Sequence, residues 1–296
     1  MSAPPSSLPP AWAYVASEVV PIEEARIPLE DRGFLFAESA YEVILCRNGR
    51  LLDWERHRAR FERSMRGVGL DAEVLLADCD AAVEGLRNVN AQGWTALMYL
   101  QATGGAGPRD HLPQRPPRPA LYGTLRHLPH GRVDGIPGNG VGVITLRDFR
   151  WQRATWKTTQ LLGAIQAKRL ARESGADEAI FVSDEGQLLE ACSMNLFVVK
   201  DGVALTPPLS LNLLPGVTRD VLLHEVGAQA REACLRVEDL RSADEIFLSS
   251  TTRAVLAVTA VDGEPVGSAT VGPVTRRLAE LMLQRQTRLL GAECEA

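Results

Sequence analysis

The chain has 296 residues, of which 45% are hydrophobic and 23% charged, an ordinary composition for a globular protein. Its formal net charge of -5 gives no basic surface of the kind that binds nucleic acid or an anionic membrane. The five cysteines have no regular spacing and no CxxC pair, which argues against a disulfide framework and against a structural metal site.

The N-terminal sequence MSAPPSSLPPAW is rich in proline and serine and lacks the apolar core of a signal peptide. We therefore expect residues 1–13 to form a disordered tail. No run of eighteen apolar residues occurs, so the sequence predicts no transmembrane helix. The cytoplasm is the expected location.

The first half of the chain alternates strand and helix patterns. Residues 41–47 are rich in β-forming side chains, and the Asn48-Gly49 pair that follows is typical of a hairpin turn. Helical spacing extends over 54–65 and 72–90, and strands are predicted at 95–103 and 120–128. Residues 104–119, between these strands, are crowded with glycine and proline and predict a loop.

The second half begins after a turn-rich segment, residues 131–140, which is the best candidate for a linker. Strands are predicted at 140–149, 178–184, 186–191, 195–200 and 245–253, and helices at 161–172, 219–226 and 274–290. This mixture predicts an α+β protein with an N-terminal domain at 14–130 and a C-terminal domain at 141–296.

Lys157 lies in the segment RWQRATWKTTQ, at the border between a strand-like run and a helix. A lysine amine can form a Schiff base with a carbonyl cofactor if part of the population is deprotonated, which burial favours. A single lysine near a helix start is more often a solvated surface residue. Lys157 is therefore a candidate catalytic residue only if other parts of a cofactor site accompany it.

Three further segments could supply those parts. Glu190, at the end of a short strand, could keep a proton on a cofactor's ring nitrogen. Gly216 and Thr218 lie where a helix N-terminus could bind phosphate, and Ser250 and Thr251 follow a strand. Alone, these residues would be a surface carboxylate, a helix cap and a polar turn. Their combination with a lysine in one lobe favours a pyridoxal phosphate site.

The order of motifs in the chain resembles a known family over roughly residues 20–265. The motifs are RGFLFAESAYE, HRARFERS, RWQRATWKTTQLLGAIQAK, ADEAIFVSDEGQLLEACSMNLF, LLPGVTRD and FLSSTTR. They resemble the fold type IV, or class IV, pyridoxal-phosphate-dependent aminotransferases. That family includes D-amino acid aminotransferases, branched-chain aminotransferases and aminodeoxychorismate lyases. The resemblance implies a small N-terminal α/β lobe and a larger C-terminal lobe with a mixed, barrel-like β-sheet and helices.

The resemblance also implies pyridoxal 5'-phosphate as cofactor and a role for each matching residue. Lys157 would hold the cofactor as a Schiff base and move a proton between the substrate's α-carbon and the cofactor's C4′. Glu190 would pair with the ring nitrogen, and Arg60 would bind the phosphate through its guanidinium fork. The other residues expected to bind the cofactor are Asn195, Leu214, Gly216, Val217, Thr218, Ser250 and Thr251.

Supporting charges are implied as well, because buried charged groups that are retained near a site tend to have a function. Arg32, Glu42 and Glu178 are expected to form a buried cluster around the lysine. Arg153 is expected to support the side of the cofactor site on which Glu190 lies.

The residues expected to bind the substrate are most like those of D-amino acid aminotransferases. In those enzymes a Pro-Arg-x-His loop reaches across a dimer interface and binds the substrate's α-carboxylate, and Pro108-Arg109-Asp110-His111 resembles it. An exposed loop without function is the alternative. Tyr41 and Thr252 are also expected on the substrate side. Many D-specific relatives carry arginine where this chain has Gly104, and a small hydroxyl residue is usual at Cys192, whose thiol could make the site oxidation-sensitive.

The expected activity is ping-pong transfer of an amino group between a D-amino acid and pyruvate or 2-oxoglutarate, by a homodimer. Branched-chain or (R)-amine aminotransferase activity, or a lyase activity on the same fold, is the alternative. A binding protein that retains the fold without catalysis is a third possibility, and the presence of Lys157 speaks against it.

Overall fold

The computed structural model describes residues 8–129, 140–225 and 229–292, which fold into two compact units. The first unit comprises residues 1–132, 156–160 and 286–296, and the second comprises 133–155 and 161–285. Two segments that we expected in the C-terminal domain, 156–160 and 286–296, thus belong to the first unit. The expected linker at 131–140 lies outside the described residues except for residue 140.

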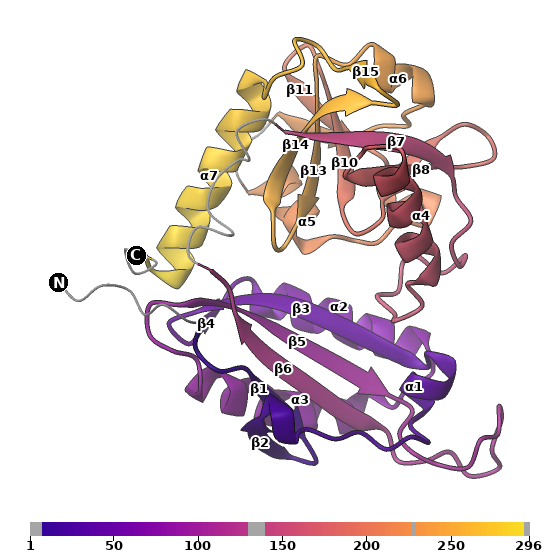
Figure 1. Ribbon diagram of the computed structural model, residues 1–296, viewed down its shortest axis with the longest axis vertical. Coiled ribbons are helices and arrows are strands. Elements are labelled where there is room, and N and C mark those ends of the chain that lie inside the picture. Colours follow the sequence, from indigo (N-terminus) through magenta and orange to yellow (C-terminus); the bar gives the residue numbers. More distant parts are fainter. Residues whose placement is uncertain (1–7, 130–139, 226–228, 293–296) are drawn as a thin grey trace. The chain divides into compact units, whose positions relative to one another are not determined.

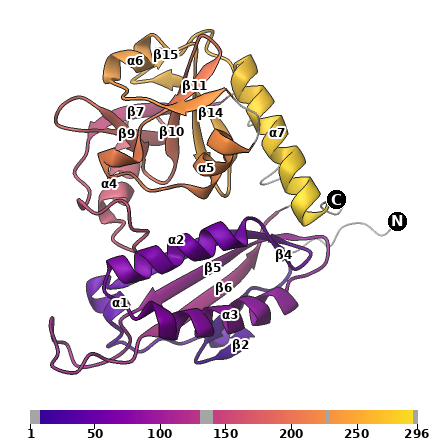
Figure 2. The same ribbon diagram turned by 180° about the vertical axis from the view of Figure 1, so that it is seen from behind.

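The first unit is a six-stranded antiparallel sheet with two helices packed on one face (Figures 1 and 2). The strand order is β2-β1-β6-β5-β3-β4. The strands are β1 (Trp12–Val15), β2 (Glu18–Pro21), β3 (Ser39–Arg47), β4 (Arg50–Leu51), β5 (Thr95–Thr103) and β6 (Ala120–His127). Strand β1 begins at Trp12, so the expected disordered tail is wrong for residues 12 and 13.

Local sequence determines several elements of this unit. Asn48 and Gly49 have φ angles of 53° and 67°, and they connect β3 to β4 in the predicted hairpin. Asp71 caps α3 by accepting hydrogen bonds from two backbone N–H groups of its first turn. The helices are η1 (Ile22–Glu24), α1 (Arg32–Phe36), α2 (Trp54–Gly67) and α3 (Ala72–Asn88). Apolar side chains of α2 and α3 fill the core against the sheet.

The second unit contains a mixed sheet in the order β12-β11-β10-β13-β14-β7-β8-β9, with β15 paired to β14. The pairs β11–β12, β14–β7 and β7–β8 are parallel, and the others are antiparallel. Ala191 N donates to Met194 O at 2.8 Å, so the end of β9 lies beside the start of β10 and the sheet curls. The strands are β7 (Val141–Arg147), β8 (Glu178–Val182), β9 (Leu188–Ala191), β10 (Asn195–Lys200), β11 (Val203–Thr206), β12 (Ala230–Glu232), β13 (Glu245–Ser250), β14 (Ala254–Val261) and β15 (Glu264–Pro265).

Helices cover the faces of this curled sheet (Figure 2). They are α4 (Leu162–Glu173), η2 (Leu209–Leu211), α5 (Val217–His224), α6 (Val237–Arg241) and α7 (Pro273–Leu290). Stacked Phe197 and Phe247, with ring centroids 4.7 Å apart, form a buried centre against α5 and α7. Helix α5 begins at Val217, two residues earlier than predicted, which places Gly216 as its N-cap.

In the parts of the chain that the structure describes, no helix combines the length and the apolar character needed to cross a bilayer. The predicted α+β fold class is confirmed, since each unit combines a β-sheet with helices.

Candidate active site

Lys157 is held by its backbone against the first unit. Its N–H donates to Ser64 Oγ of α2 at 3.0 Å, and its carbonyl accepts from Tyr41 N of β3 at 2.9 Å. The next residue, Thr158, forms an antiparallel bridge with Ala40. The segment 156–160 therefore adds a short strand-like piece to the start of β3.

The side chain of Lys157 lies over an aromatic ring. Its Nζ is 4.4 Å from the ring centroid of Tyr41, which stacks in turn on Tyr99 at 5.5 Å. The chain has three lysines, and the other two, Lys168 and Lys200, are each ion-paired with a carboxylate. Within the described part of the first unit, no carboxylate forms an ion pair with Lys157.

Trp156, immediately before the lysine, packs tightly on Gly67 at the end of α2. A Cβ added to Gly67 would lie 2.4 Å from Trp156 Cε2, well inside van der Waals contact. Helix α2 thus supports the lysine segment twice, through the Ser64 hydroxyl and through the flat surface that Gly67 leaves for the indole.

A buried ion pair lies beside this segment, on strand β3 and helix α2. Arg60 donates to both carboxylate oxygens of Glu42, at 2.9 and 2.6 Å, and His57 Nδ1 lies 3.1 Å from the same carboxylate. Burial alone would raise the pKa of Glu42, but the charge of Arg60 and the His57 contact outweigh it and hold the pKa well below its usual range. Glu42 is therefore ionised at neutral pH.

The predicted charge cluster of Arg32, Glu42 and Glu178 around the lysine stays a prediction, and the structure shows the partner of each residue within its own unit. Arg32 pairs with Glu38 instead of Glu42. Glu178 belongs to the second unit and pairs with Lys168 at 3.1 Å. All three residues are buried, as expected for charged groups near a site, but the sequence pattern did not identify the partner of each one.

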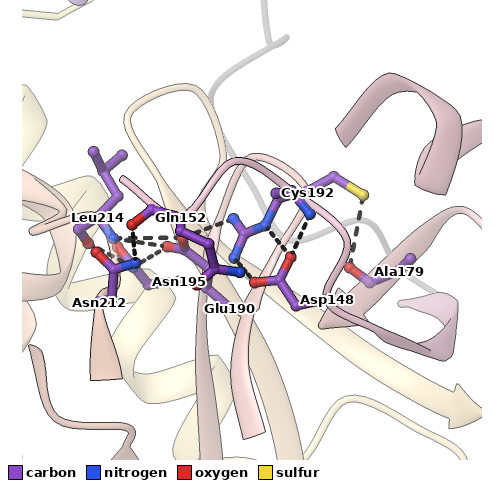
Figure 3. Close-up of polar contacts among 9 residues, drawn as sticks. Asp148, Gln152, Ala179, Glu190, Cys192, Asn195, Asn212 and Leu214 are labelled. Atoms are coloured by element: carbon purple, nitrogen blue, oxygen red, sulfur yellow. Dashed lines mark hydrogen bonds and ion pairs between the residues drawn. The ribbon is translucent and has the colours of Figure 1, made fainter. Parts of the chain in front are cut away.

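In the second unit, Glu190 is the centre of a buried polar network (Figure 3). Its carboxylate accepts hydrogen bonds from Arg150 Nη1 at 2.8 Å, from Asn195 Nδ2 at 3.1 Å and from Leu214 N at 3.2 Å. Arg150 also pairs with Asp148 at 2.9 Å. The arrangement presents a carboxylate that is fixed in position by three donors.

Arg150 is the arginine that supports Glu190, and our prediction did not name it. The prediction named Arg153, which is exposed. Arg150 is largely buried, and its guanidinium carbon lies 4.1 Å from the centroid of the Phe181 ring. The segment RWQR contains both arginines three residues apart, and no local pattern distinguishes the one that points inward.

Burial raises the pKa of Glu190 above its usual range, although the charge of Arg150 and the hydrogen bonds from Arg150 and Leu214 act in the opposite direction. A carboxylate in this position gains most from a cationic N–H partner that shares its buried site. A protonated ring nitrogen is such a partner.

The N-terminus of α5 is the second feature of this unit. Its N-cap is Gly216, and no side chain in the described residues caps the N–H groups of Val217 and Thr218. A Cβ added to Gly216 would lie 1.9 Å from Asn195 Oδ1, so a larger residue would displace the Asn195 side chain, which binds Glu190 and Leu214 O. The helix start therefore leaves backbone donors available for an anion.

Strand β13 ends at Ser250, and the turn after it carries Thr251 and Thr252. The side chain of Ser250 accepts a hydrogen bond from Arg253 N at 3.3 Å, which closes the turn. One position earlier, the buried hydroxyl of Ser249 has no hydrogen-bond partner among the described residues. Ser249 is paired with Asn195 across the β10–β13 ladder, next to the Glu190 network. Such an orphaned group is expected where a ligand completes the site.

The Pro108-Arg109-Asp110-His111 loop lies between β5 and β6 of the first unit, and its side chains are exposed. Asp110 uses its carboxylate to accept a hydrogen bond from Leu112 N at 3.1 Å. No carboxylate in the described residues of this unit forms an ion pair with Arg109. The guanidinium of Arg109 is thus presented without an anionic partner from its own loop.

Cys192 lies in a buried environment that disfavours its thiolate form. Its side chain is buried and donates weakly to Ala179 O at 3.8 Å (Figure 3). Burial and the nearby Glu178 carboxylate raise the pKa of its thiol to about 12, which leaves little thiolate at neutral pH. The expected oxidation sensitivity of the site stays a prediction, and the burial and raised pKa of Cys192 act against it.

Comparison with known proteins places these features in a family. Residues 39–261 match the model of the family described as amino-transferase class IV. The chain is 35% identical over 273 residues to a D-alanine aminotransferase of Staphylococcus aureus (strain MSSA476), covering 90% of this chain and 95% of that protein.

Solved structures show the same fold. The branched-chain aminotransferase of the thermophilic archaeon Thermoproteus uzoniensis superimposes with a TM-score of 0.77 at 25% identity, covering 97% of this chain and 96% of that one. The pyridoxal-phosphate-bound form of a hypothetical aminotransferase from Mycobacterium tuberculosis gives a TM-score of 0.78 at 22% identity, covering 94% of this chain and 99% of that one. The predicted fold type IV architecture is thereby confirmed. Pyridoxal 5'-phosphate is the cofactor of this family, and the chain belongs to the class IV aminotransferases.

Proposed function

We propose that this protein transfers amino groups between D-amino acids and 2-oxo acids, with pyridoxal 5'-phosphate attached to Lys157. The observation that carries the proposal is the setting of Lys157. Of the three lysines, it is the one for which the described residues of its unit form no ion pair, and hydrogen bonds fix its backbone on both sides. A carboxylate partner would favour the ammonium form, whereas covalent attachment to a carbonyl needs the free amine.

The residues of the second unit fit the phosphate of this cofactor. The uncapped N–H groups of Val217 and Thr218 and the hydroxyls of Ser250 and Thr251 are neutral donors suited to phosphate oxygens. In the first unit, Arg60 would add charge, and its pairing with Glu42 would hold its guanidinium in one orientation. These roles are proposals that rest on the chemistry of the donors.

The cofactor's ring also has fitting partners. Glu190 would keep the ring nitrogen protonated, with Arg150 and Asn195 holding the carboxylate in place. Leu214 would pack on the ring, and its backbone N–H already binds Glu190. The unpartnered hydroxyl of Ser249, beside Asn195, supports a ligand at this place.

When bound, pyridoxal phosphate supplies an electron sink for the bonds at the substrate's α-carbon. Lys157 Nζ would take the proton from that carbon and deliver it to C4′ of the cofactor, acting first as base and then as acid. The Tyr41 ring beneath Nζ would limit the directions from which the amine can act. The first oxo acid would leave before the second one binds, so the kinetics would be ping-pong.

The substrate's α-carboxylate would bind to Arg109 and His111, with Tyr41 and Thr252 on the substrate side. Arg109 is suited to this because its guanidinium has no carboxylate partner among the described residues of its unit and can bind two oxygens at once. The name of the Staphylococcus aureus relative, D-alanine aminotransferase, supports D-amino acids as the substrate class.

A homodimer is part of the proposal, because in D-amino acid aminotransferases the matching loop acts across a dimer interface. Leu29 and Leu112, which are 79% and 87% exposed, are the most exposed large apolar side chains of the described residues, and both belong to the first unit. These two side chains would lose their exposure if the dimer interface covered them. Sedimentation analysis of the active enzyme tests this part of the proposal, and a fully active monomer would contradict it.

The test of the function combines attachment and turnover. The purified protein with pyridoxal phosphate should absorb visible light, and borohydride reduction followed by peptide mapping should place the adduct on Lys157. The chain has three lysines, so peptide mapping can distinguish an adduct on Lys157 from one on Lys168 or Lys200. Lys157→Ala should lose turnover while Lys200→Ala, which breaks a surface pair with Asp239, should keep it. Transamination by the Lys157 variant would refute the proposal.

A panel of D- and L-amino acids with pyruvate or 2-oxoglutarate tests the substrate class. We expect turnover of D-alanine or D-glutamate and none of their L-enantiomers. The alternative is a branched-chain, (R)-amine or lyase activity, and the absence of an arginine at Gly104 is the observation that favours it. Arg109→Ala distinguishes the two, because unchanged kinetics on D-alanine would place the carboxylate site elsewhere.

A further inference from the structure

We propose that the short helix α1 positions the substrate-binding loop, and that Phe36 and Arg32 are the positioning residues. This inference rests on the proposed function, in which Arg109 and His111 bind the substrate's carboxylate. All of the residues concerned belong to the first unit.

The side chain of Arg32 spans two elements. Its Nε donates to Glu38, while Nη1 and Nη2 donate to the carbonyls of Asp110 and His111, the latter at 3.1 Å. Arg32 is buried, and this set of acceptors includes one carboxylate, which neutralises its charge. One guanidinium therefore fixes the backbone of two consecutive loop residues.

The ring of Phe36 is the meeting point of three side chains. The guanidinium carbons of Arg32 and Arg109 lie 5.0 and 5.6 Å from its centroid, and the ring of His111 lies 5.2 Å away. Both residues that we assign to carboxylate binding thus contact the same aromatic ring. Because Glu38 balances the charge of Arg32, the ring can hold Arg109 without strong repulsion between the two arginines.

Backbone contacts make α1 a rigid support. Arg32 N donates to Gly105 O at 2.9 Å, and Gly104 N donates to Glu38 O at 3.1 Å. Gly105 has a φ of 76°, and a Cβ there would lie 1.9 Å from Arg118 O. The carboxylate of Asp31 caps the helix at Gly33 N. The start of the loop is therefore held, and its exposed tip depends on Arg32 and Phe36.

The contacts of Phe36 should affect the binding of the substrate's carboxylate more than the rate of proton transfer. An exposed arginine that is free to rotate loses conformational freedom when it binds a carboxylate, and a prior contact with an aromatic ring reduces that loss. Loss of the Phe36 contacts with Arg109 and His111 should weaken carboxylate binding about 5-fold. The turnover number should change little, because neither residue is assigned to proton transfer.

The test uses the holoenzyme and two matched variants of α1. Phe36→Leu removes the ring, and Phe34→Leu makes the same change at a neighbouring side chain that is 65% exposed. We expect Phe36→Leu to raise KM for D-alanine and for 2-oxoglutarate about 5-fold with kcat within about 2-fold, and Phe34→Leu to leave both unchanged. Arg32→Lys keeps the charge but cannot bind both carbonyls, so it should raise KM in the same way.

The energetic coupling between Phe36 and Arg109 distinguishes a positioning role from a purely structural one. It is measured from KM in the two single variants and the double variant. In the Arg109→Ala background, Phe36→Leu should raise KM by less than it does alone, because its contact with Arg109 is already lost and only the contact with His111 remains. Reaction of the cofactor with an amine that has no carboxylate should be equally fast in all variants. An unchanged KM in Phe36→Leu, a loss confined to kcat, or additive effects with Arg109→Ala would overturn the inference. If the unmodified enzyme does not turn over amino acids, the proposed function itself fails, and this inference fails with it.

Discussion

Substitution of Glu42 by glutamine should destabilise the first unit strongly. The change is nearly isosteric, but it leaves the buried guanidinium of Arg60 without its carboxylate, which binds it at 2.9 and 2.6 Å. Breaking a buried ion pair from one side costs about 3–5 kcal/mol, because the remaining charge stays desolvated. With a urea m-value of about 2 kcal/mol per molar, the midpoint of unfolding should fall by about 2 M.

Tryptophan fluorescence in urea is a suitable assay, because four of the five tryptophans belong to the first unit. The control is Glu62→Gln on α2, the helix that carries Arg60, where it breaks an exposed ion pair with Arg66 at 2.9 Å. That pair should contribute less than about 0.5 kcal/mol. Equal midpoints for the two variants would refute the view that burial gives the Glu42 pair its importance.

The same pair predicts a dependence on pH. Because the folded pKa of Glu42 is lowered from its ordinary value of 4.5, the ionised carboxylate contributes its stability fully above that value. The contribution is lost as the pH falls from there through the folded pKa. The difference in free energy of unfolding between the unmodified protein and Glu42→Gln should therefore be constant near neutral pH. It should become smaller below pH 4.5. A difference that grows with acid would contradict the sign of the shift.

Three further substitutions follow from close contacts. Gly67→Ala should displace Trp156, 2.4 Å from the new Cβ, and lower kcat about 10- to 100-fold in steady-state assays, since small misplacements of catalytic groups have effects of this size. Gly216→Ala should collide with Asn195 at 1.9 Å and weaken retention of pyridoxal phosphate during dialysis about 10-fold or more. Asp31→Ala removes hydrogen bonds from Gly33 N and two hydroxyls at 2.8 to 2.9 Å, and should lower the free energy of unfolding by about 2 kcal/mol in urea titrations.

Features that depend on local sequence could be predicted well. The Asn48-Gly49 hairpin was correct because its backbone conformation is a property of the two residues themselves. The long helices α2, α3 and α7 were predicted because their apolar positions repeat with helical spacing. Strand β14 was missed although AVLAVTAV contains β-branched residues, because it follows a polar turn and is buried on both sides.

Features that depend on distant contacts could not be predicted. Arg150 and Arg153 are equivalent in the sequence, and only the folded chain brings Arg150 to Glu190. Arg32 was correctly expected to be buried, but its partners in the 110–111 loop are almost eighty residues away. The assignment of the segment 156–160 to the first unit is of the same kind, since it depends on pairing with β3.

That assignment explains why the surroundings of Lys157 are so specific. Lys157 lies in a five-residue segment of the first unit, while the residues before and after it, 133–155 and 161–285, belong to the second. Chain continuity within the first unit therefore cannot fix the position of the lysine relative to β3. Hydrogen bonds to Ser64 and Tyr41 and the contact of Trp156 with Gly67 must do so. An amine that has to reach the same carbon in every cycle needs this support, because catalysis depends on sub-ångström placement of the reacting groups.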